Sequence, residues 1–215
     1  MADVKICGIR TPADFDTCRD AGAAFIGMVF YPKSPRHLDD LTAQTLADHA
    51  DRYGDDAPLR VALTVNMDDM QMDRVVAVAR PHLIQLHGDE TAGRAKAIIA
   101  RYRLPIIKAI RVATAADLDC CADWNGIAEW LLFDAKGDPG GLPGGTGHSF
   151  DWRLLDGQAG SQKWMLAGGL DVDNVARAIA TTGAKVIDIS SGVESAPGQK
   201  DPERIRAFVS AAQIG

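Results

Sequence analysis

Short apolar segments that alternate with helical patterns predict an α/β fold for this chain, a single (β/α)8 TIM barrel. The apolar segments are rich in Val, Ile, Leu and Phe and show little polar alternation, as parallel strands covered by helices do. Eight such segments and eight helical patterns fit into 215 residues, the lower end of the size range of this barrel. We therefore expect one domain over residues 1–215.

The expected strands share branched or aromatic apolar residues in runs of four to six. They are Val4–Ile9, Phe25–Phe30, Arg60–Val65, Leu83–His87, Pro105–Ile110, Trp130–Asp134, Trp164–Ala167 and Val186–Ser190. Many of the expected helices open with Asp, Ser or Thr, which cap helix N-termini. They are Pro12–Ala21, Asp39–Tyr53, Asp68–Ala79, Glu90–Arg101, Thr114–Ala122, Ser149–Leu155, Asp171–Thr182 and Asp201–Ala212.

A doubly wound open sheet is the competing fold, and the first turn argues against it. That fold binds dinucleotides through a GxGxxG motif directly after its first strand. Here the first strand ends in CGIRT at residues 7–11. We therefore favour the barrel.

The net charge, the cysteine spacing and the lengths of the apolar runs argue against several classes of binding partner. The net charge is −6 and no basic block occurs, which argues against a nucleic-acid partner. Cys7, Cys18, Cys120 and Cys121 have no metal-ligand spacing, so we expect no metal and reduced thiols in a cytoplasmic protein. No apolar run approaches the roughly 20 residues of a membrane helix, and no secretory signal is evident, so no membrane association is expected.

Strand alternation places polar side chains inside the barrel. If Ile6 faces outward under a helix, Lys5 and Cys7 face inward, and the same alternation turns Asp134 and Asp188 inward. Unpaired, such buried charges would each cost several kcal/mol, so they need one another or a ligand. They converge at the C-terminal mouth, where the active sites of such barrels lie.

Residue type alone leaves the roles open. A buried lone cysteine such as Cys7 is more often inert core than catalytic. Asp134 is the last residue of an apolar strand, and its carboxylate could be catalytic, cap a helix or form a structural ion pair. Gln85 and His87 share one face of a strand, where they could bind a ligand or simply make structural hydrogen bonds at the rim of the barrel. Arg36 follows the second strand and could be a solvated loop charge.

Two glycine-bearing turns suggest a phosphate site. Gly168 and Gly169 follow the seventh strand, and Ser190, Ser191 and Gly192 follow the eighth. Barrels often bind phosphate with these two loops, through backbone N–H groups that glycine leaves accessible. A third connection, residues 135–149, is long and rich in Gly and Pro. It is either a surface insertion or an active-site loop.

Seven motifs are spread along nearly the whole length of the chain: VKICGIRTPAD at 4–14, GMVFYPKSPRHL at 27–38, IQLHGDE at 84–90, LLFDAK at 131–136, PGGTGHSFDW at 143–152, LAGGLDVDNV at 166–175 and IDISSGVESAPGQKD at 187–201. Together and in this order they give the chain a resemblance to the phosphoribosylanthranilate isomerase family. The resemblance implies a barrel that performs an Amadori rearrangement on a small phosphosugar, in tryptophan biosynthesis, without cofactor or metal.

The same resemblance implies roles for the candidate residues. Cys7 matches the general base and Asp134 the general acid, while Arg36 matches the position that holds the anthranilate carboxylate. The AGG and SSG turns match the phosphate site, Asp188 matches a substrate-contacting position, and the QLHG motif lines the site. The connection before GGTG is longer than expected for the family. We expect a monomer or a homodimer.

The chemistry is compatible with these positions. An acid must protonate the furanose ring oxygen, and a base must then remove the proton at C2, so the two groups should flank the sugar. Strands one and six can supply them across the mouth. A protonated Asp134 is favoured by an apolar, partly desolvated site. We expect Lys5 to lower the pKa of the Cys7 thiol below its usual value of about 8.5.

Two rival functions remain. The histidine-pathway isomerase performs the same rearrangement in a similar barrel, but it has a carboxylate where this chain has Cys7 and an internal duplication that is not evident here. A non-catalytic phosphosugar-binding protein would keep Arg36 and the glycine turns without needing Cys7 and Asp134 together.

Overall fold

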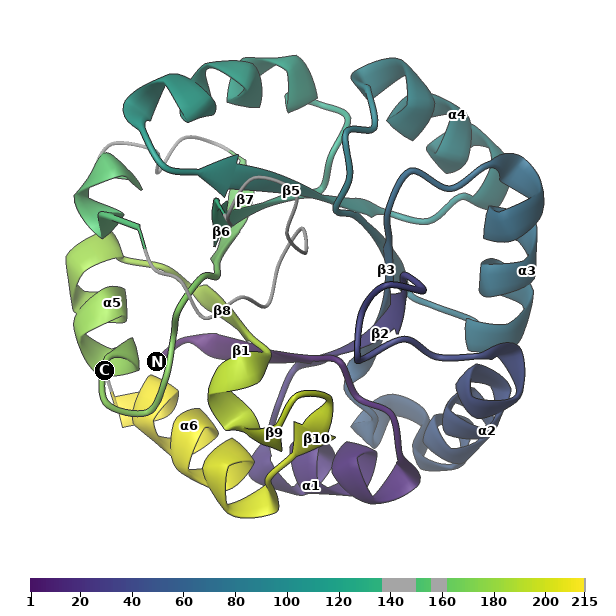
Figure 1. Cartoon of the computed structure of the whole chain (residues 1–215), viewed down its shortest axis with the longest axis horizontal. Helices are drawn as coiled ribbons and strands as arrows, with labels where there is room; N and C mark the ends of the chain where they lie inside the picture. The colour runs from purple at the N-terminus through teal and green to yellow at the C-terminus, as the bar shows by residue number, and fades with distance from the viewer. Residues whose placement is uncertain (137–149, 156–161, 215) are drawn as a thin grey trace.

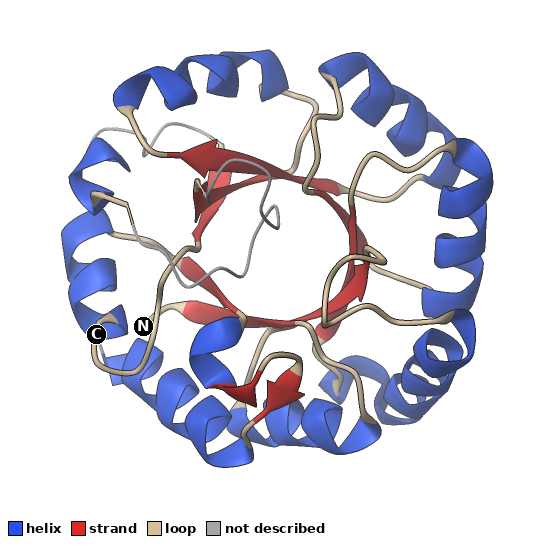
Figure 2. Ribbon diagram, viewed as in Figure 1, coloured by secondary structure: helices blue, strands red, loops and turns tan. Residues whose placement is uncertain are grey.

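The computed structural model describes residues 1–136, 150–155 and 162–214 and has the expected TIM-barrel fold (Figure 1). Eight strands form a closed barrel in the order β1 to β8, and every neighbouring pair is parallel. Strand β8 closes the barrel against β1. The helices form a ring outside the strands (Figure 2). None of the described helices is long and apolar enough to span a membrane.

The barrel strands are four to seven residues long and each overlaps its expected segment. They are β1 Asp3–Cys7, β2 Phe25–Phe30, β3 Leu59–Thr64, β4 Leu83–Leu86, β5 Ile106–Val112, β6 Trp130–Ala135, β7 Lys163–Leu166 and β8 Val186–Ile189. The α-helices are α1 Pro12–Ala21, α2 Asp40–Ala50, α3 Asp69–Ala79, α4 Ala92–Tyr102, α5 Val175–Thr182 and α6 Pro202–Ile214. Four short 3-10 helices are η1 Asp51–Asp56, η2 Ala115–Trp124, η3 Trp152–Leu155 and η4 Ser191–Val193.

Helix α1 shows how local chemistry sets the boundaries. The Thr11 hydroxyl accepts a hydrogen bond from the N–H of Asp14 at 3.1 Å, and Pro12 occupies the first helical position. Gly22 ends the helix with φ 85°, a left-handed conformation that glycine adopts without a side-chain clash. The expected boundaries of this helix are confirmed.

Three segments differ from expectation. The fifth helical pattern forms the 3-10 helix η2 rather than an α-helix, and the Asp117 carboxylate caps its start by accepting the backbone N–H groups of Ala113 and Thr114. Of the sixth expected helix, only η3 lies in the described residues. Strands β9 (Glu194–Ala196) and β10 (Gln199–Lys200) form a small antiparallel sheet after β8 that was not predicted, because segments this short carry no periodic pattern. Most of the 135–149 connection, including GGTG, lies outside the described residues.

The core has two layers, as strand alternation predicts. Ile6, Ile187 and Ile189 pack outward against the helices. A second cluster fills the barrel interior with large side chains, including Val61 and Met165. This apolar cluster fills the barrel below its C-terminal mouth, which polar side chains line.

Candidate active site

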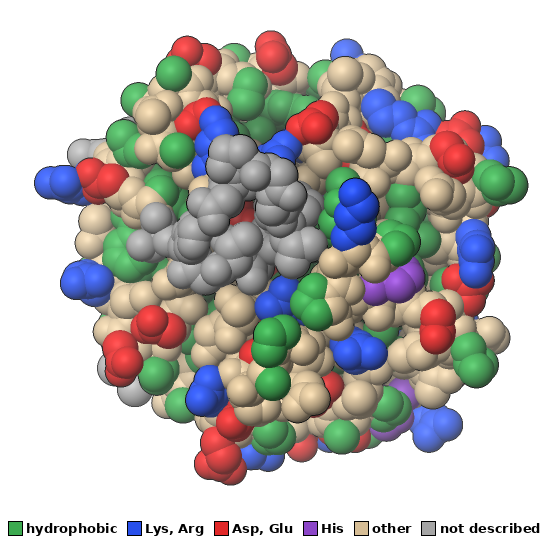
Figure 3. All heavy atoms as spheres, in the orientation of Figure 1, with side chains coloured by type: hydrophobic (Ala, Val, Ile, Leu, Met, Phe, Trp, Pro, Cys, Tyr) green, Lys and Arg blue, Asp and Glu red, His purple; other side chains and the backbone are tan. Residues whose placement is uncertain are grey.

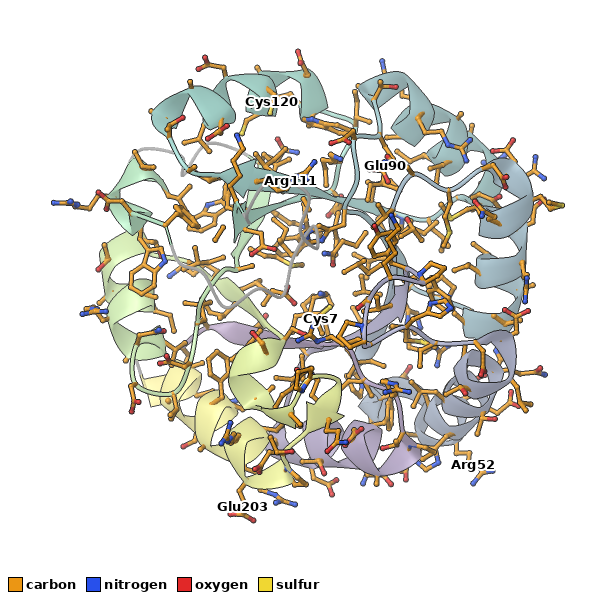
Figure 4. The ribbon with its side chains drawn as sticks, in the orientation of Figure 1. Cys7, Arg52, Glu90, Arg111, Cys120 and Glu203 are labelled. Atoms are coloured by element: carbon orange, nitrogen blue, oxygen red, sulfur yellow. The ribbon has the colours of Figure 1, made fainter. Side chains whose placement is uncertain are left out.

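The polar residues predicted to face inward meet at the C-terminal mouth of the barrel. Cys7, Gln85, His87, Asp134 and Asp188 are all buried there. Figure 4 shows Cys7 at the inner side of the mouth, at the end of β1. Figure 3 shows Lys and Arg side chains around the middle of the same face, which suits an anionic ligand.

On the β1–β8 side, Lys5 and Asp188 form an ion pair. The two residues are partners in the register of β1 and β8, and Lys5 Nζ lies 2.7 Å from Asp188 Oδ1. Lys5 is fully buried. The charges that the sequence placed in the barrel therefore compensate each other, as their burial requires.

The Cys7 thiol lies in tightly packed surroundings. A Cβ atom on Gly27 of β2 would lie 2.7 Å from Cys7 Sγ, so glycine is needed for this approach. Burial raises the pKa of the thiol above 9.0, Lys5 lowers it by less, and Asp188 raises it further. The expected fall in this pKa is therefore wrong, because desolvation outweighs the attraction of a lysine that already has a carboxylate partner.

On the β4–β6 side, Gln85 and His87 lead to Asp134. Gln85 Nε2 lies 2.9 Å from His87 Nδ1. When the amide donates, Nδ1 accepts and the ring proton sits on Nε2, which lies 3.4 Å from Asp134 Oδ2. Asp134 Oδ1 accepts a hydrogen bond from the N–H of Ala135 at 2.9 Å. The structure thus brings three of the predicted residues into one chain of contacts.

One acceptor on this side is unpaired. Gln85 is fully buried, yet its Oε1 has no hydrogen-bond partner within the described part of the chain. Such an orphaned group costs about 1–3 kcal/mol of stability. Unsatisfied polar atoms of this kind occur where a ligand or a changing proton arrangement completes the bonding.

Arg36 is buried rather than solvated. Its Nε and Nη2 lie 2.7 and 2.8 Å from the two carboxylate oxygens of Glu194, a bidentate pair. The stem crosses Gly8, where a Cβ would lie 2.6 Å from Arg36 Cδ and where φ is +85°. Gly8, which follows Cys7 in the chain, therefore leaves room for the Arg36 side chain.

Sequence reasoning missed Glu194 and Lys200. Lys200 Nζ donates to Glu194 Oε1 at 2.8 Å and to the Ser190 carbonyl at 2.9 Å. Both residues lie in the unpredicted β9–β10 sheet. The available signal was their position inside the motif at 187–201, directly after the last barrel strand.

The glycine turns after β7 and β8 adjoin. Gly168 and Gly169 have φ values of 88° and 64°, and a Cβ on Gly168 would lie 2.6 Å from the Ala135 nitrogen. A Cβ on Gly192 would collide with the Leu170 carbonyl, so the second turn packs against the first. Gly168, Gly169, Ser191 and Gly192 remain partly exposed at the mouth.

Ser190 behaves differently from its neighbours in the second turn. Its hydroxyl donates to the Cys7 carbonyl at 3.0 Å, and its own carbonyl accepts a hydrogen bond from Lys200 Nζ.

The described residues contain no group of three His, Cys, Asp or Glu side chains that could hold a metal ion.

Comparisons with known proteins show the family of this chain. A model of the family described as N-(5'phosphoribosyl)anthranilate (PRA) isomerase matches residues 4–211. An N-(5'-phosphoribosyl)anthranilate isomerase from Cereibacter sphaeroides is 48% identical over 211 residues, 98% of each chain. The chain belongs to the phosphoribosylanthranilate isomerase family.

Solved structures of phosphoribosylanthranilate isomerases share the fold over the whole chain. The enzyme from Thermotoga maritima has a TM-score of 0.88 and 31% identity, with complete coverage of both chains. A second structure, solved in complex with reduced 1-(o-carboxyphenylamino)-1-deoxyribulose 5-phosphate, has a TM-score of 0.85 and 29% identity, again with complete coverage. The chain is therefore an isomerase of tryptophan biosynthesis.

Proposed function

We propose that this chain converts N-(5'-phosphoribosyl)anthranilate into 1-(2-carboxyphenylamino)-1-deoxyribulose 5-phosphate, with Asp134 as general acid and Cys7 as general base. The observation that carries the proposal is the inward position of both groups on separate walls of one buried mouth. The related isomerase complex, which contains the reduced form of this product, supports the choice of reaction.

In the first step, Asp134 transfers a proton to the furanose ring oxygen. The bond between C1 and that oxygen breaks, and the lone pair of the anthranilate nitrogen forms a C1=N iminium. The resulting Asp134 carboxylate already accepts the Ala135 N–H and faces His87 Nε2. These contacts stabilise the negative charge that the step creates.

In the second step, the Cys7 thiolate removes the proton at C2. The released electron pair forms a C1=C2 bond and neutralises the iminium, giving an enolamine. Transfer of the C2 hydroxyl proton to C1 then yields the ketone. The steps move only protons and electron pairs, with no net oxidation or reduction, and proton exchange with solvent then deprotonates Cys7 and reprotonates Asp134. We therefore propose that no cofactor or metal is needed.

The environment of Cys7 suits a strong base. Because burial raises the pKa of the Cys7 thiol, only a small fraction of it is ionised at neutral pH. The thiolate that does form is a stronger base than one with an ordinary pKa, so it removes a proton more readily. Lys5 favours the charged form and Asp188 holds Lys5 in place. We propose that Asp188 also contacts the substrate at the mouth.

The remaining candidates are proposed to bind the ends of the substrate. Arg36 would hold the anthranilate carboxylate. Backbone N–H groups of two turns would hold the phosphate: those of Gly168 and Gly169, where positive φ can aim them at an anion, and those of Ser191 and Gly192 at the start of η4. Ser190 would contribute by fixing the second turn to β1.

We further propose that residues 1–215 form one domain and that the protein acts in the cytoplasm as a monomer or homodimer, without nucleic-acid or membrane partners. The family match over residues 4–211 supports one domain, and four unpaired thiols suit a reducing compartment. A related structure is described as monomers generated from a dimeric isomerase of Thermotoga maritima.

Complementation tests the function. Expression of this chain should restore growth without tryptophan to an auxotroph that lacks the isomerase, and a Cys7→Ala, Asp134→Asn double variant should not. The purified protein should turn over N-(5'-phosphoribosyl)anthranilate in preference to the aminophosphoribosyl compound of the histidine pathway. Preference for the latter would support the rival isomerase, and unchanged ligand would support a binding protein.

A further inference from the structure

Arg36, the residue proposed to hold the substrate carboxylate, belongs to a cluster of three buried charges with Glu194 and Lys200. Glu194 accepts two hydrogen bonds from Arg36, one from Lys200 Nζ and one from the Gly198 N–H, the last at 3.2 Å. The side chains of all three charged residues are nine-tenths or more buried. The Glu194 carboxylate is therefore saturated with donors and rigidly placed.

This Arg36–Glu194–Lys200 cluster carries an unbalanced charge. It contains two cations and one anion, so its formal charge is +1. The two other buried lysine pairs, Lys5–Asp188 and Lys108–Glu90, are neutral. A surplus charge in a buried site is costly, and it attracts an anion strongly because little water screens it.

The pKa directions in the cluster agree with a surplus of positive charge. Burial raises the pKa of Glu194, yet Arg36 and Lys200 together hold it below its usual value. Burial lowers the pKa of Lys200, and Glu194 does not fully restore it. The two cations thus stabilise the Glu194 anion, whereas burial works against the charge of Lys200.

Arg36 retains hydrogen-bonding capacity. Its Nε and one N–H of Nη2 face Glu194, and a guanidinium has five N–H groups. Within the described residues, the N–H groups of Nη1 and the second N–H of Nη2 are left for another acceptor. The fixed plane of the Arg36–Glu194 pair sets their direction.

A neutral Arg–Glu pair would bind a substrate carboxylate poorly, because Glu194 would repel it as Arg36 attracts it. Lys200 removes this difficulty by offsetting the charge of Glu194. Lys200 is also tied through the Ser190 carbonyl to the turn that binds the end of β1.

We infer that Glu194 and Lys200 are positioning and specificity-determining residues: Glu194 orients Arg36, and Lys200 preserves the surplus charge that selects a substrate bearing an aromatic carboxylate. The inference rests on the proposed function and extends it to two residues outside the proton-transfer steps.

The test replaces one lysine and uses another as a matched control. Lys200→Met removes the surplus charge and keeps the length of the side chain. Lys108→Met is the matched substitution, since Lys108 is equally buried and also donates to a glutamate and a backbone carbonyl, Glu90 at 3.1 Å and Gly88 at 2.7 Å. Lys108 packs beside Trp124, and its Nζ is bound to the β4–β6 side of the mouth, outside the Arg36–Glu194–Lys200 cluster.

Two probes give the readout: the product 1-(2-carboxyphenylamino)-1-deoxyribulose 5-phosphate and its analogue without the carboxylate, 1-phenylamino-1-deoxyribulose 5-phosphate. Calorimetric titration should show that Lys200→Met weakens binding of the carboxylate probe about tenfold or more and of the analogue less than about twofold, as loss of a buried charge interaction requires. Turnover should show a raised KM with kcat within about threefold. Lys108→Met should leave the ratio of the two affinities unchanged.

Further variants make the result decisive. Lys200→Gln removes the charge but can still donate to Glu194, and it replaces methionine if that variant does not fold. In an Arg36→Met background, Lys200→Met should cost less selectivity than in the wild type, because the carboxylate probe has then already lost its direct hydrogen-bond partner.

Equal weakening of both probes by Lys200→Met and Lys200→Gln, or no change in either probe, would overturn the inference while wild-type turnover still supports the proposed function. A wild-type protein that binds neither probe and does not turn over the substrate would overturn both.

Discussion

The two walls of the mouth differ in how completely their polar groups are paired. On the β1–β8 wall, Lys5, Asp188, Arg36, Glu194 and Lys200 make ion pairs of 2.7–2.8 Å. On the β4–β6 wall, the contact between His87 and Asp134 is 3.4 Å, and Gln85 Oε1 has no partner among the described residues. Apart from Cys7 at the end of β1, the first wall is arranged for binding, whereas the second keeps hydrogen-bonding capacity for a moving proton.

The strand order accounts for this difference. β1 and β8 are neighbours in the barrel, so their register sets Lys5 beside Asp188. β4 and β6 are separated by β5, so His87 and Asp134 must reach across a strand. The comparison predicts that substitutions on the β4–β6 wall act mainly on kcat and substitutions on the β1–β8 cluster act mainly on KM.

Asp134→Asn should have the largest effect. The amide cannot donate a carboxylic proton to the ring oxygen, so kcat should fall by about 10²–10⁴-fold. KM should stay within about tenfold, because the proton is used only in the transition state. Steady-state kinetics measure both, and a variant with wild-type kcat would remove Asp134 from the mechanism.

Arg36→Ala should rank second and act on KM. A guanidinium–carboxylate pair is present in both the ground state and the transition state, and its loss should cost about 2–4 kcal/mol, or about 30- to 1000-fold in KM. The kcat should change little. An unchanged KM would place the anthranilate carboxylate elsewhere.

Gln85→Leu should separate stability from activity. It removes an orphaned buried oxygen, which offsets the lost bond to His87, so the Tm should be unchanged or higher. Without its anchor, His87 should hold Asp134 less well, and kcat should fall about two- to tenfold, the equivalent of one hydrogen bond. A lower Tm with unchanged kcat would show that Gln85 is purely structural.

Alkylation of the exposed thiol Cys120 should have the smallest effect on activity. Cys120 is exposed, so iodoacetamide at pH 7 should label it first, without inactivation. Cys7 is buried and its pKa lies above 9.0, so its labelling rate should rise about tenfold per pH unit from 7 to 9. Peptide mapping against residual activity measures this. Labelling of Cys7 ahead of Cys120, or a rate that levels off below pH 8, would contradict the burial of the thiol.

Strand alternation was sufficient to predict which polar residues converge. It predicts that Lys5, Cys7, Asp134 and Asp188 face inward, because the period-two alternation of side chains follows from strand geometry alone. Capping chemistry likewise predicted both ends of α1, since Thr11 and Gly22 act within one turn of the helix.

Alternation could not predict what depends on packing or on very short elements. The pKa of Cys7 is set by desolvation, which depends on the close approach of Gly27 from the next strand. Glu194 and Lys200 lie in strands of three and two residues, which are too short for any period to show. The sequence patterns therefore could not identify Glu194 as the partner of Arg36, and only the folded structure shows this pair.

The most direct test of the division between acid and base is the deuterium isotope effect on kcat for N-(5'-phosphoribosyl)anthranilate labelled at C2. In Cys7→Ser, cleavage of the C2–H bond should become rate-limiting, so we expect a larger isotope effect than in the wild type. In Asp134→Asn, ring opening should become rate-limiting and breaks no C–H bond, so the effect should approach unity. Isotope effects of equal size in the two variants would contradict the assignment of separate roles to Cys7 and Asp134.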